Sequence, residues 1–157
     1  MRAIFLDVDG VLNSSETKAK IGGLKGVSKK NLRFLRHIVA RTQAKIILTS
    51  AWNINFDEKL VPTTKAGMYL YHRLWENNLW LYDKVDDNGG NREQAVAEYV
   101  ERHKGLITDW VIIDDTHYAD YESLNAKHIV YTSYEFGLTK ASASEAIIKL
   151  GCTVGTW

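Results

Sequence analysis

Apolar and polar positions follow two patterns along this chain. Short apolar runs of the kind that forms buried strands end in acids or hydroxyls, and between them apolar residues recur every three or four positions, as on one face of a helix. Strands that alternate with helices predict an α/β domain with a parallel sheet. The predicted strands are a first run from Ile4 into Asp7 and Asp9, then residues 45–50, 79–82, 110–115 and 127–131.

Amphipathic stretches between these runs predict helices. Ser28, Asn91 and Thr139 each precede such a stretch, and side chains of this kind cap helices by accepting a hydrogen bond from the first turn. The capped helices are predicted over residues 29–42, 92–104 and 139–150. A further helical stripe, expected to pack into the core, comprises Met68, Tyr71, Leu74 and Trp75.

Length and composition predict one globular domain over residues 1–157. Of its 157 residues, 45% are apolar, which is enough to bury a sizeable core. No apolar run approaches the roughly 18 residues of a membrane span, and the N-terminus enters a strand pattern with no signal-peptide segment. Cys152 is the only cysteine and has no internal disulfide partner. We therefore expect a soluble, cytoplasmic protein with no membrane partner.

Charge is unevenly distributed, although the net charge is only +1. Residues 17–45 contain nine basic residues and no acidic one. Such asymmetry is typical of a surface that faces a polyanion, but a solvated helix face next to a loop would look the same. Residues 14–27 carry three glycines among serines and lysines, which favours a loop or short hairpin overhanging the end of the first strand.

Asp7 and Asp9 close the first strand. Because side chains alternate along a strand, Leu6 and Val8 are expected on one side and both acids on the other. Two crowded carboxylates repel each other unless something neutralises them, so the pair predicts a divalent metal, a shared proton, or both. Gly10 then allows a sharp turn without a Cβ penalty.

A second acidic pair, Asp114 and Asp115, closes the strand of residues 110–115. Buried acids without partners are costly, so packing does not explain two apolar strands that each end in a carboxylate pair. Parallel strands end at one edge of a sheet, where ligands bind. Four carboxylates meeting there would suit a hard divalent cation.

Other polar groups are predicted at the same edge. Thr49 and Ser50 end their strand, and hydroxyls can bond phosphoryl oxygens without adding charge. Arg92 lies in the first turn of a predicted helix, where the helix dipole disfavours a cation, so a carboxylate or phosphoryl partner explains it better than helix stability does. Trp52 is either a stacking wall for a base or sugar or an anchor in the core.

Three of these segments resemble motifs of the haloacid dehalogenase (HAD) superfamily of Mg-dependent phosphotransferases: FLDVDGVLN at residues 5–13, IILTSAW at 46–52 and VIIDD at 111–115. The resemblance covers the whole chain. It implies a three-layer, Rossmann-like fold with a parallel sheet of about five strands and the first strand central. The gaps between motifs are too short for a large cap domain, so an open site is expected.

The resemblance also implies roles for the acids and hydroxyls. Asp7 would attack phosphorus to form an aspartyl-phosphate, and Asp9 would protonate the leaving oxygen and later activate water. Thr49 is the first choice for the hydroxyl of the second motif, and Ser50 is the alternative. The expected activity is that of a phosphomonoesterase.

Cation and metal roles follow from the third and fourth motifs. Arg92 is the equivalent of the usual lysine, with Lys84 as the alternative. Asp115 is the expected direct metal ligand, whereas Asp114 would orient a metal-bound water or Arg92, and Asp120 would support the site from behind. The resemblance implies Mg²⁺ as the cofactor, and Asp7 and the backbone carbonyl of Asp9 complete its set of ligands.

The substrate is predicted only by class. An open site, a basic segment and Trp52 favour a DNA or RNA end or a nucleotide, as in HAD domains of polynucleotide kinase-phosphatases and RNA-repair proteins. A phosphoprotein phosphatase, a small-metabolite phosphatase and a catalytically weak metal-binding module are the alternatives, and the oligomeric state stays open. The expected substrate-binding residues are Gly10, Trp52, Asn53 and Lys84.

Overall fold

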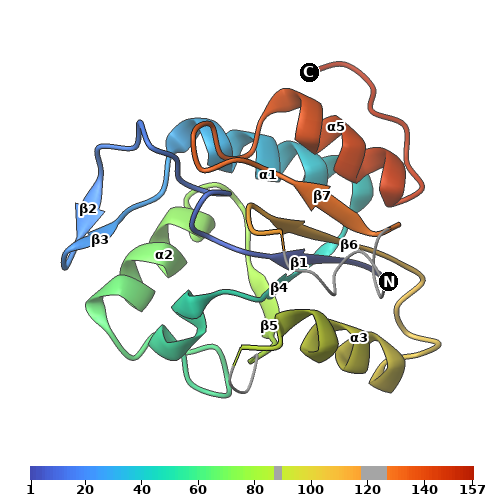
Figure 1. The fold of residues 1–157 in the computed structure, drawn as a ribbon, viewed down its shortest axis with the longest axis horizontal. Helices are drawn as coiled ribbons and strands as arrows, with labels where there is room; N and C mark the ends of the chain where they lie inside the picture. The colour runs from blue at the N-terminus through green and yellow to red at the C-terminus, as the bar shows by residue number, and fades with distance from the viewer. Residues whose placement is uncertain (87–89, 118–126) are drawn as a thin grey trace.

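The computed structural model describes residues 1–86, 90–117 and 127–157. Its centre is a parallel sheet of five strands in the order β5-β4-β1-β6-β7, with the first strand in the middle (Figure 1). This confirms the predicted α/β architecture and the central place of the first strand. The strands are β1 (Arg2–Leu6), β4 (Lys45–Leu48), β5 (Leu81–Lys84), β6 (Asp109–Asp114) and β7 (Ile129–Tyr131).

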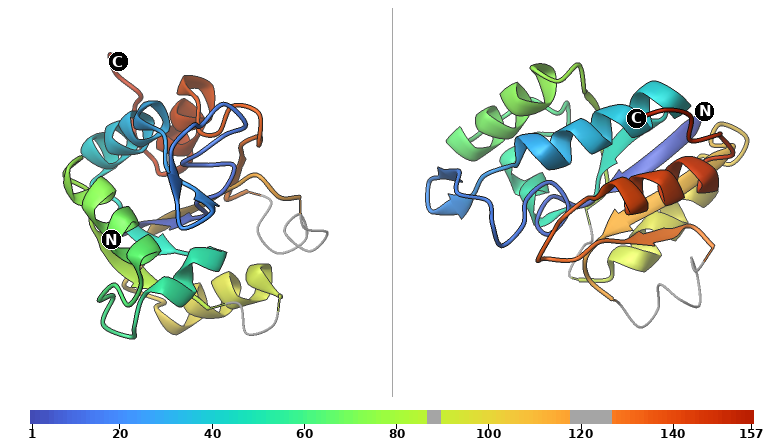
Figure 2. Two further views of the ribbon diagram at one scale, coloured as in Figure 1. Left: turned by 90° about the vertical axis from the view of Figure 1, so that its left-hand side faces the viewer. Right: turned by 90° about the horizontal axis from the view of Figure 1, so that it is seen from above.

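Helices cover both faces of the sheet, as Figures 1 and 2 show. Alternate residues of β1 enter different cores: Ile4 and Leu6 pack with α1, α2 and α5, whereas Phe5 packs with α3 on the opposite face. Both faces of the strand are therefore buried, as parallel sheets require, and the predicted three layers are confirmed. The helices are α1 (Lys29–Thr42), α2 (Lys65–Trp75), α3 (Arg92–Arg102) and α5 (Lys140–Lys149).

Capping side chains set the helix starts where the sequence predicts them. Ser28, Asn91 and Thr139 each accept a hydrogen bond from a backbone N–H of the first turn. Each bond satisfies one of the amide groups that a helix start leaves unpaired. The predicted start of each of these helices is therefore confirmed to within one residue.

Several strand boundaries differ from the prediction. The strand predicted over 45–50 ends at Leu48, because Ser50 caps a 3₁₀ helix, η1 (Ala51–Asn55), and the chain turns there. The strand predicted over 79–82 lies two residues later, as β5, and the last strand is shorter than 127–131. Because β5 is an edge strand, it accommodates polar residues that the apolar pattern excluded.

The predicted core stripe of α2 is wrong. Met68, Tyr71 and Trp75 are exposed, and Leu74 is the one stripe residue that the core buries. The buried face instead contains Gly67, Leu70 and Leu74. Gly67 lies so close to η1 that an added Cβ would be 2.3 Å from the Asn55 carbonyl oxygen, so this contact decides which face of α2 turns inward.

A small hairpin follows β1, in the segment predicted as a loop or hairpin. It consists of β2 (Lys20–Ile21) and β3 (Leu24–Lys25), which pair in antiparallel fashion. No larger domain covers the sheet edge in the described part of the chain, consistent with the expected lack of a large cap. Within those residues every helix is too short or too polar to cross a lipid bilayer.

Candidate active site

Strand register brings the motif residues to one edge of the sheet. Leu6 of β1 lies opposite Ile113 of β6 on one side and Leu48 of β4 on the other. The residues that follow these partners, Asp7, Asp114 and Thr49, therefore lie at the same level at the edge of the sheet. The Asp7 amide still donates to the Ile113 carbonyl at 3.0 Å, which ties the start of the next loop to β6.

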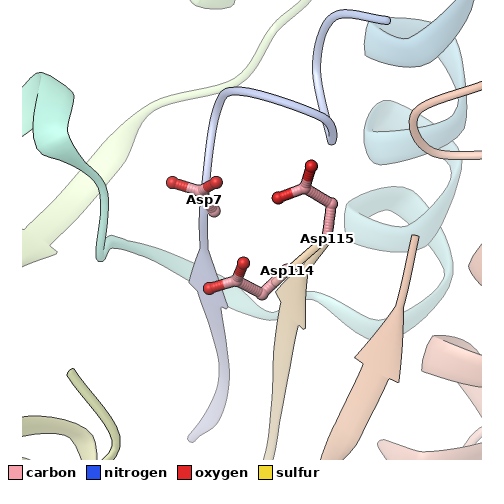
Figure 3. Close-up of side chains that lie close together, drawn as sticks. All are labelled: Asp7, Asp114 and Asp115. Carbon is pink, nitrogen blue, oxygen red and sulfur yellow. The ribbon is translucent and has the colours of Figure 1, made fainter. Parts of the chain in front are cut away.

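Asp7, Asp114 and Asp115 form a carboxylate cluster at this edge (Figure 3). One oxygen atom from each lies within 4.8 Å of the others. Asp7 and Asp114 are buried, and Asp115 is partly exposed. Three carboxylate oxygens at this spacing fit a hard divalent cation, so the cluster can hold a metal ion.

Electrostatics support this fit. Burial, followed by the charge of Asp114, raises the pKa of Asp7 to about 7, against the lowering effects of Arg92 and the Ser50 hydroxyl. Burial and Asp114 also raise the pKa of Asp115. The cluster thus holds more negative charge than its buried surroundings favour, and a divalent cation would relieve that repulsion.

Arg92 is the cation that contacts the cluster. It is the first residue of α3, and its Nη1 lies 2.8 Å from Asp114 Oδ2 and 3.4 Å from Asp7 Oδ1. Lys84, the alternative from the sequence, instead pairs with Asp86 and Glu58. The geometry therefore favours Arg92 for the third-motif role.

A cavity of about 220 Å³ opens beside the cluster. The Ser50 hydroxyl lies near enough to the Asp7 carboxyl to lower its pKa, whereas the buried Thr49 hydroxyl has no hydrogen-bond partner among the described residues. The Asn53 side chain is also buried, and its amide donates to the Val85 carbonyl at 2.7 Å. The predicted binding residues that line this cavity are Thr49, Ser50, Asn53, Lys84 and Arg92.

Asp9 does not share the environment of Asp7. Because β1 ends at Leu6, strand alternation stops before Asp9, which lies exposed in a turn. Its two carboxylate oxygens accept hydrogen bonds from Asn13 Nδ2 at 2.8 Å and Trp52 Nε1 at 3.0 Å. The expectation that both acids project from one face of a strand is therefore corrected.

Trp52 is an anchor in the core rather than a stacking wall. Its side chain is only 3% exposed, which leaves no ring face for a base, and its indole N–H bonds Asp9. The contacts of Trp52 and Asn13 with Asp9 were not predicted from the sequence. Asn13 lies close to Asp9 within the first motif, and this proximity in sequence could have predicted their contact. Trp52 is 43 residues from Asp9, so no local pattern predicts its contact.

Gly10 lets the first loop pass close to Asp115. Its φ is +70°, and an added Cβ would lie 2.0 Å from Asp115 Oδ2. Only glycine fits this combination of left-handed backbone and close approach. Asp120, predicted to support the site, lies outside the described residues.

Comparison with protein families agrees with this geometry. Residues 3–143 match the family described as the HAD domain in Swiss Army Knife RNA repair proteins. The chain belongs to this HAD family. The match spans all the motif residues from Asp7 to Asp115, so the resemblance seen in the sequence is confirmed. No curated protein and no solved structure matches the chain. Membership of the HAD family implies phosphatase chemistry.

Proposed function

We propose that this HAD protein is a Mg²⁺-dependent phosphomonoesterase that acts on phosphorylated nucleic-acid ends. The observation that carries the proposal is the Asp7, Asp114 and Asp115 cluster, with Arg92 against it and a hydroxyl-lined cavity alongside. A carboxylate nucleophile, a cation and neutral donors are the groups that phosphoryl transfer needs.

Asp7 is the proposed nucleophile. One of its oxygens attacks phosphorus, and the leaving oxygen takes a proton from Asp9, which gives an aspartyl-phosphate. Asp9 then removes a proton from the water that hydrolyses this intermediate. Asp9 suits both steps because it is exposed to solvent. It also lies near enough to the cluster for its charge to contribute to the raised pKa of Asp115.

Two further groups would hold the phosphoryl oxygens. Arg92 supplies positive charge, and Ser50 supplies a hydroxyl at the mouth of the cavity. Mg²⁺, when bound by Asp7, Asp115 and the Asp9 carbonyl, would neutralise charge on the carboxylates and the phosphoryl group. Asp114, which bonds Arg92, would fix the guanidinium.

A basic surface supports the choice of a nucleic-acid substrate. Helix α1 begins beside the hairpin and runs above the sheet, behind α5 (Figure 1). Its exposed basic side chains form no ion pair with any described residue. Exposed cations without an acidic partner can bind a phosphodiester backbone. This basic surface comprises Lys18, Lys20, Lys29, Lys30, Arg33 and Arg36.

Substrate class is tested with 3′- and 5′-phosphorylated oligonucleotides, nucleotides, phosphopeptides and p-nitrophenyl phosphate. We expect Mg²⁺-dependent phosphate release, with kcat/KM highest for an oligonucleotide end and falling as salt rises. Replacing Lys29 and Arg33 together by glutamine should raise KM for the oligonucleotide about fivefold, from roughly 0.5 kcal/mol per contact. It should not change turnover of p-nitrophenyl phosphate.

The matched control replaces Arg102 and Lys104, exposed cations at the end of α3, by glutamine. This pair should leave both substrates unaffected, because α3 covers the opposite face of the sheet. Phosphate release from the oligonucleotide that does not change with salt concentration would contradict the nucleic-acid assignment. No Mg²⁺-dependent release from any substrate would instead indicate a metal-binding module without catalysis.

Paired hydroxyl variants test which residue fills the second-motif role. Ser50 lies beside Asp7 and lines the cavity, so we expect Ser50→Ala to lower kcat/KM by about 10²-fold, which is typical of losing a hydrogen-bond donor to developing charge. Thr49→Val keeps the shape of the buried side chain and should cost less than about threefold. Initial rates for both variants measure this, and the reverse ranking would assign the role to Thr49.

A further inference from the structure

The carboxylate of Asp9 is held by two side chains that the proposed mechanism has not yet used. Asn13 Nδ2 donates to Oδ1 at 2.8 Å, and Trp52 Nε1 donates to Oδ2 at 3.0 Å. Asp9 itself is exposed, but both donors are buried. Buried N–H groups need acceptors, and these two donors both use the same exposed carboxylate, one at each of its oxygens.

Both donors are fixed independently of Asp9. The Oδ1 atom of Asn13 accepts the backbone N–H of Gly10 at 2.9 Å, so its amide N–H₂ must face the other way, towards Asp9. Trp52 is 3% exposed and packs in the main core from η1, which leaves its ring no freedom to turn. The two motifs, at their last residues Asn13 and Trp52, thus supply a rigid pair of hydrogen-bond donors to Asp9.

We propose that Trp52 and Asn13 are positioning residues that hold Asp9 for proton transfer to the leaving oxygen. The proposal rests on the phosphatase function above. Each carboxylate oxygen has two lone-pair positions, so one bond to each oxygen fixes the group and still leaves room for an acidic proton facing the substrate. Positioning of this kind contributes to general acid catalysis because proton transfer depends on geometry.

The first chemical step shows where this positioning acts. As the bond from Asp7 to phosphorus forms, the bond to the leaving oxygen breaks and its electron pair stays on that oxygen. An alkoxide, such as the sugar oxygen of a nucleotide, needs the proton of Asp9 to leave. A 2,4-dinitrophenolate is stable without a proton. Displacement of Asp9 should therefore slow phosphoryl transfer from a nucleotide far more than phosphoryl transfer from a 2,4-dinitrophenyl ester.

Trp52→Phe tests the proposal, because it keeps a buried aromatic ring and removes the N–H donor together with part of the indole. The measurement is kcat/KM with a nucleoside 3′-monophosphate and with 2,4-dinitrophenyl phosphate, since kcat/KM reports steps up to the first phosphoryl transfer. We expect a loss of about 30-fold with the nucleotide, within the range of general acid catalysis, and at least ten times less loss with the dinitrophenyl ester.

Trp110→Phe is the matched control. Trp110 is a partly buried tryptophan that stacks on His128 at the N-terminal half of β6, and its replacement should leave the ratio between the two substrates unchanged. Asn13→Asp is a second, independent variant. It keeps an acceptor for the Gly10 amide but replaces the donor to Asp9 with an acceptor, and it should give the same selective loss.

The outcomes separate this inference from the function on which it rests. If the wild-type protein releases phosphate from neither ester, the phosphatase proposal fails. If the wild type is active and Trp52→Phe loses equally on both esters, or on neither, the positioning role is overturned. Should Trp52→Phe not fold, as near-ultraviolet circular dichroism would show, the ratio measured for Asn13→Asp decides.

Discussion

Asp7→Asn should abolish phosphate release and leave the fold intact. An amide cannot replace the carboxylate as a nucleophile, and the loss of a nucleophile typically lowers kcat by more than about 10⁴-fold. Turnover with Mg²⁺ and circular dichroism of the same sample measure both parts. Asp109→Asn, which changes a partly exposed acid at the opposite end of β6, is the control and should keep full activity. Full activity of Asp7→Asn would refute the assignment.

The same variant should be more stable than the wild type when no metal is present. Burial raises the pKa of Asp7 from 3.8 to about 7, so the folded protein holds a proton that the unfolded chain releases between these values. The stabilising contribution of the protonated Asp7 carboxyl to the free energy of unfolding is fully present below about pH 4. It is lost as the pH rises through about 7.

Denaturant unfolding of both proteins in chelator at pH 4 and pH 8 tests this difference. Asp7→Asn should exceed the wild type in unfolding free energy at pH 8, by up to about 4 kcal/mol, and match it near pH 4. Mg²⁺ should stabilise the wild type at pH 8 more than it stabilises the variant. Equal stability at both pH values would show that Asp7 is not desolvated.

Arg92→Met should lower both activity and stability. The guanidinium lies 2.8 Å from buried Asp114 and 3.4 Å from Asp7. Its removal leaves the phosphoryl group and two buried acids without a neighbouring positive charge. We expect kcat/KM to fall by about 10³-fold and the unfolding free energy without metal to fall by roughly 3 kcal/mol. Steady-state kinetics and urea unfolding measure the two effects.

Lys84→Met is the matched comparison for Arg92→Met. Lys84 pairs with Asp86 and Glu58 rather than with the carboxylate cluster, and its side chain is also buried. Its loss should lower kcat/KM by less than about tenfold. A larger effect from Lys84 than from Arg92 would transfer the third-motif role to the lysine.

The sequence predicted the sheet and most of its helices because local signals agree there. Caps such as Ser28 and Asn91 mark helix starts, and apolar runs with acids at their ends mark the strands and the edge where Asp7 and Asp114 meet. The buried face of α2 was not predictable in this way, because apolar residues lie on both sides of that helix. The tertiary contact of Gly67 with η1 decides which face of α2 is buried, and no local sequence pattern indicates that contact.

The candidate site shows the same division. Spacing alone could not choose between Arg92 and Lys84, or between Thr49 and Ser50, because each choice depends on where a side chain points after the strand has ended. The environment of Asp9 depends on where β1 ends, which is at Leu6, three residues before the end that the acidic pair suggests. Its bond to Trp52 joins two loops that local sequence analysis treats separately.

The position of β1 between β4 and β6 has a consequence for how the protein is made. During synthesis Asp7 leaves the ribosome about a hundred residues before β6, which carries Asp114 and is followed directly by Asp115. Until that strand docks, one side of β1 has no neighbour and the carboxylate cluster is incomplete. Ion affinity should therefore arise late in biosynthesis, and truncated translation products should lack it.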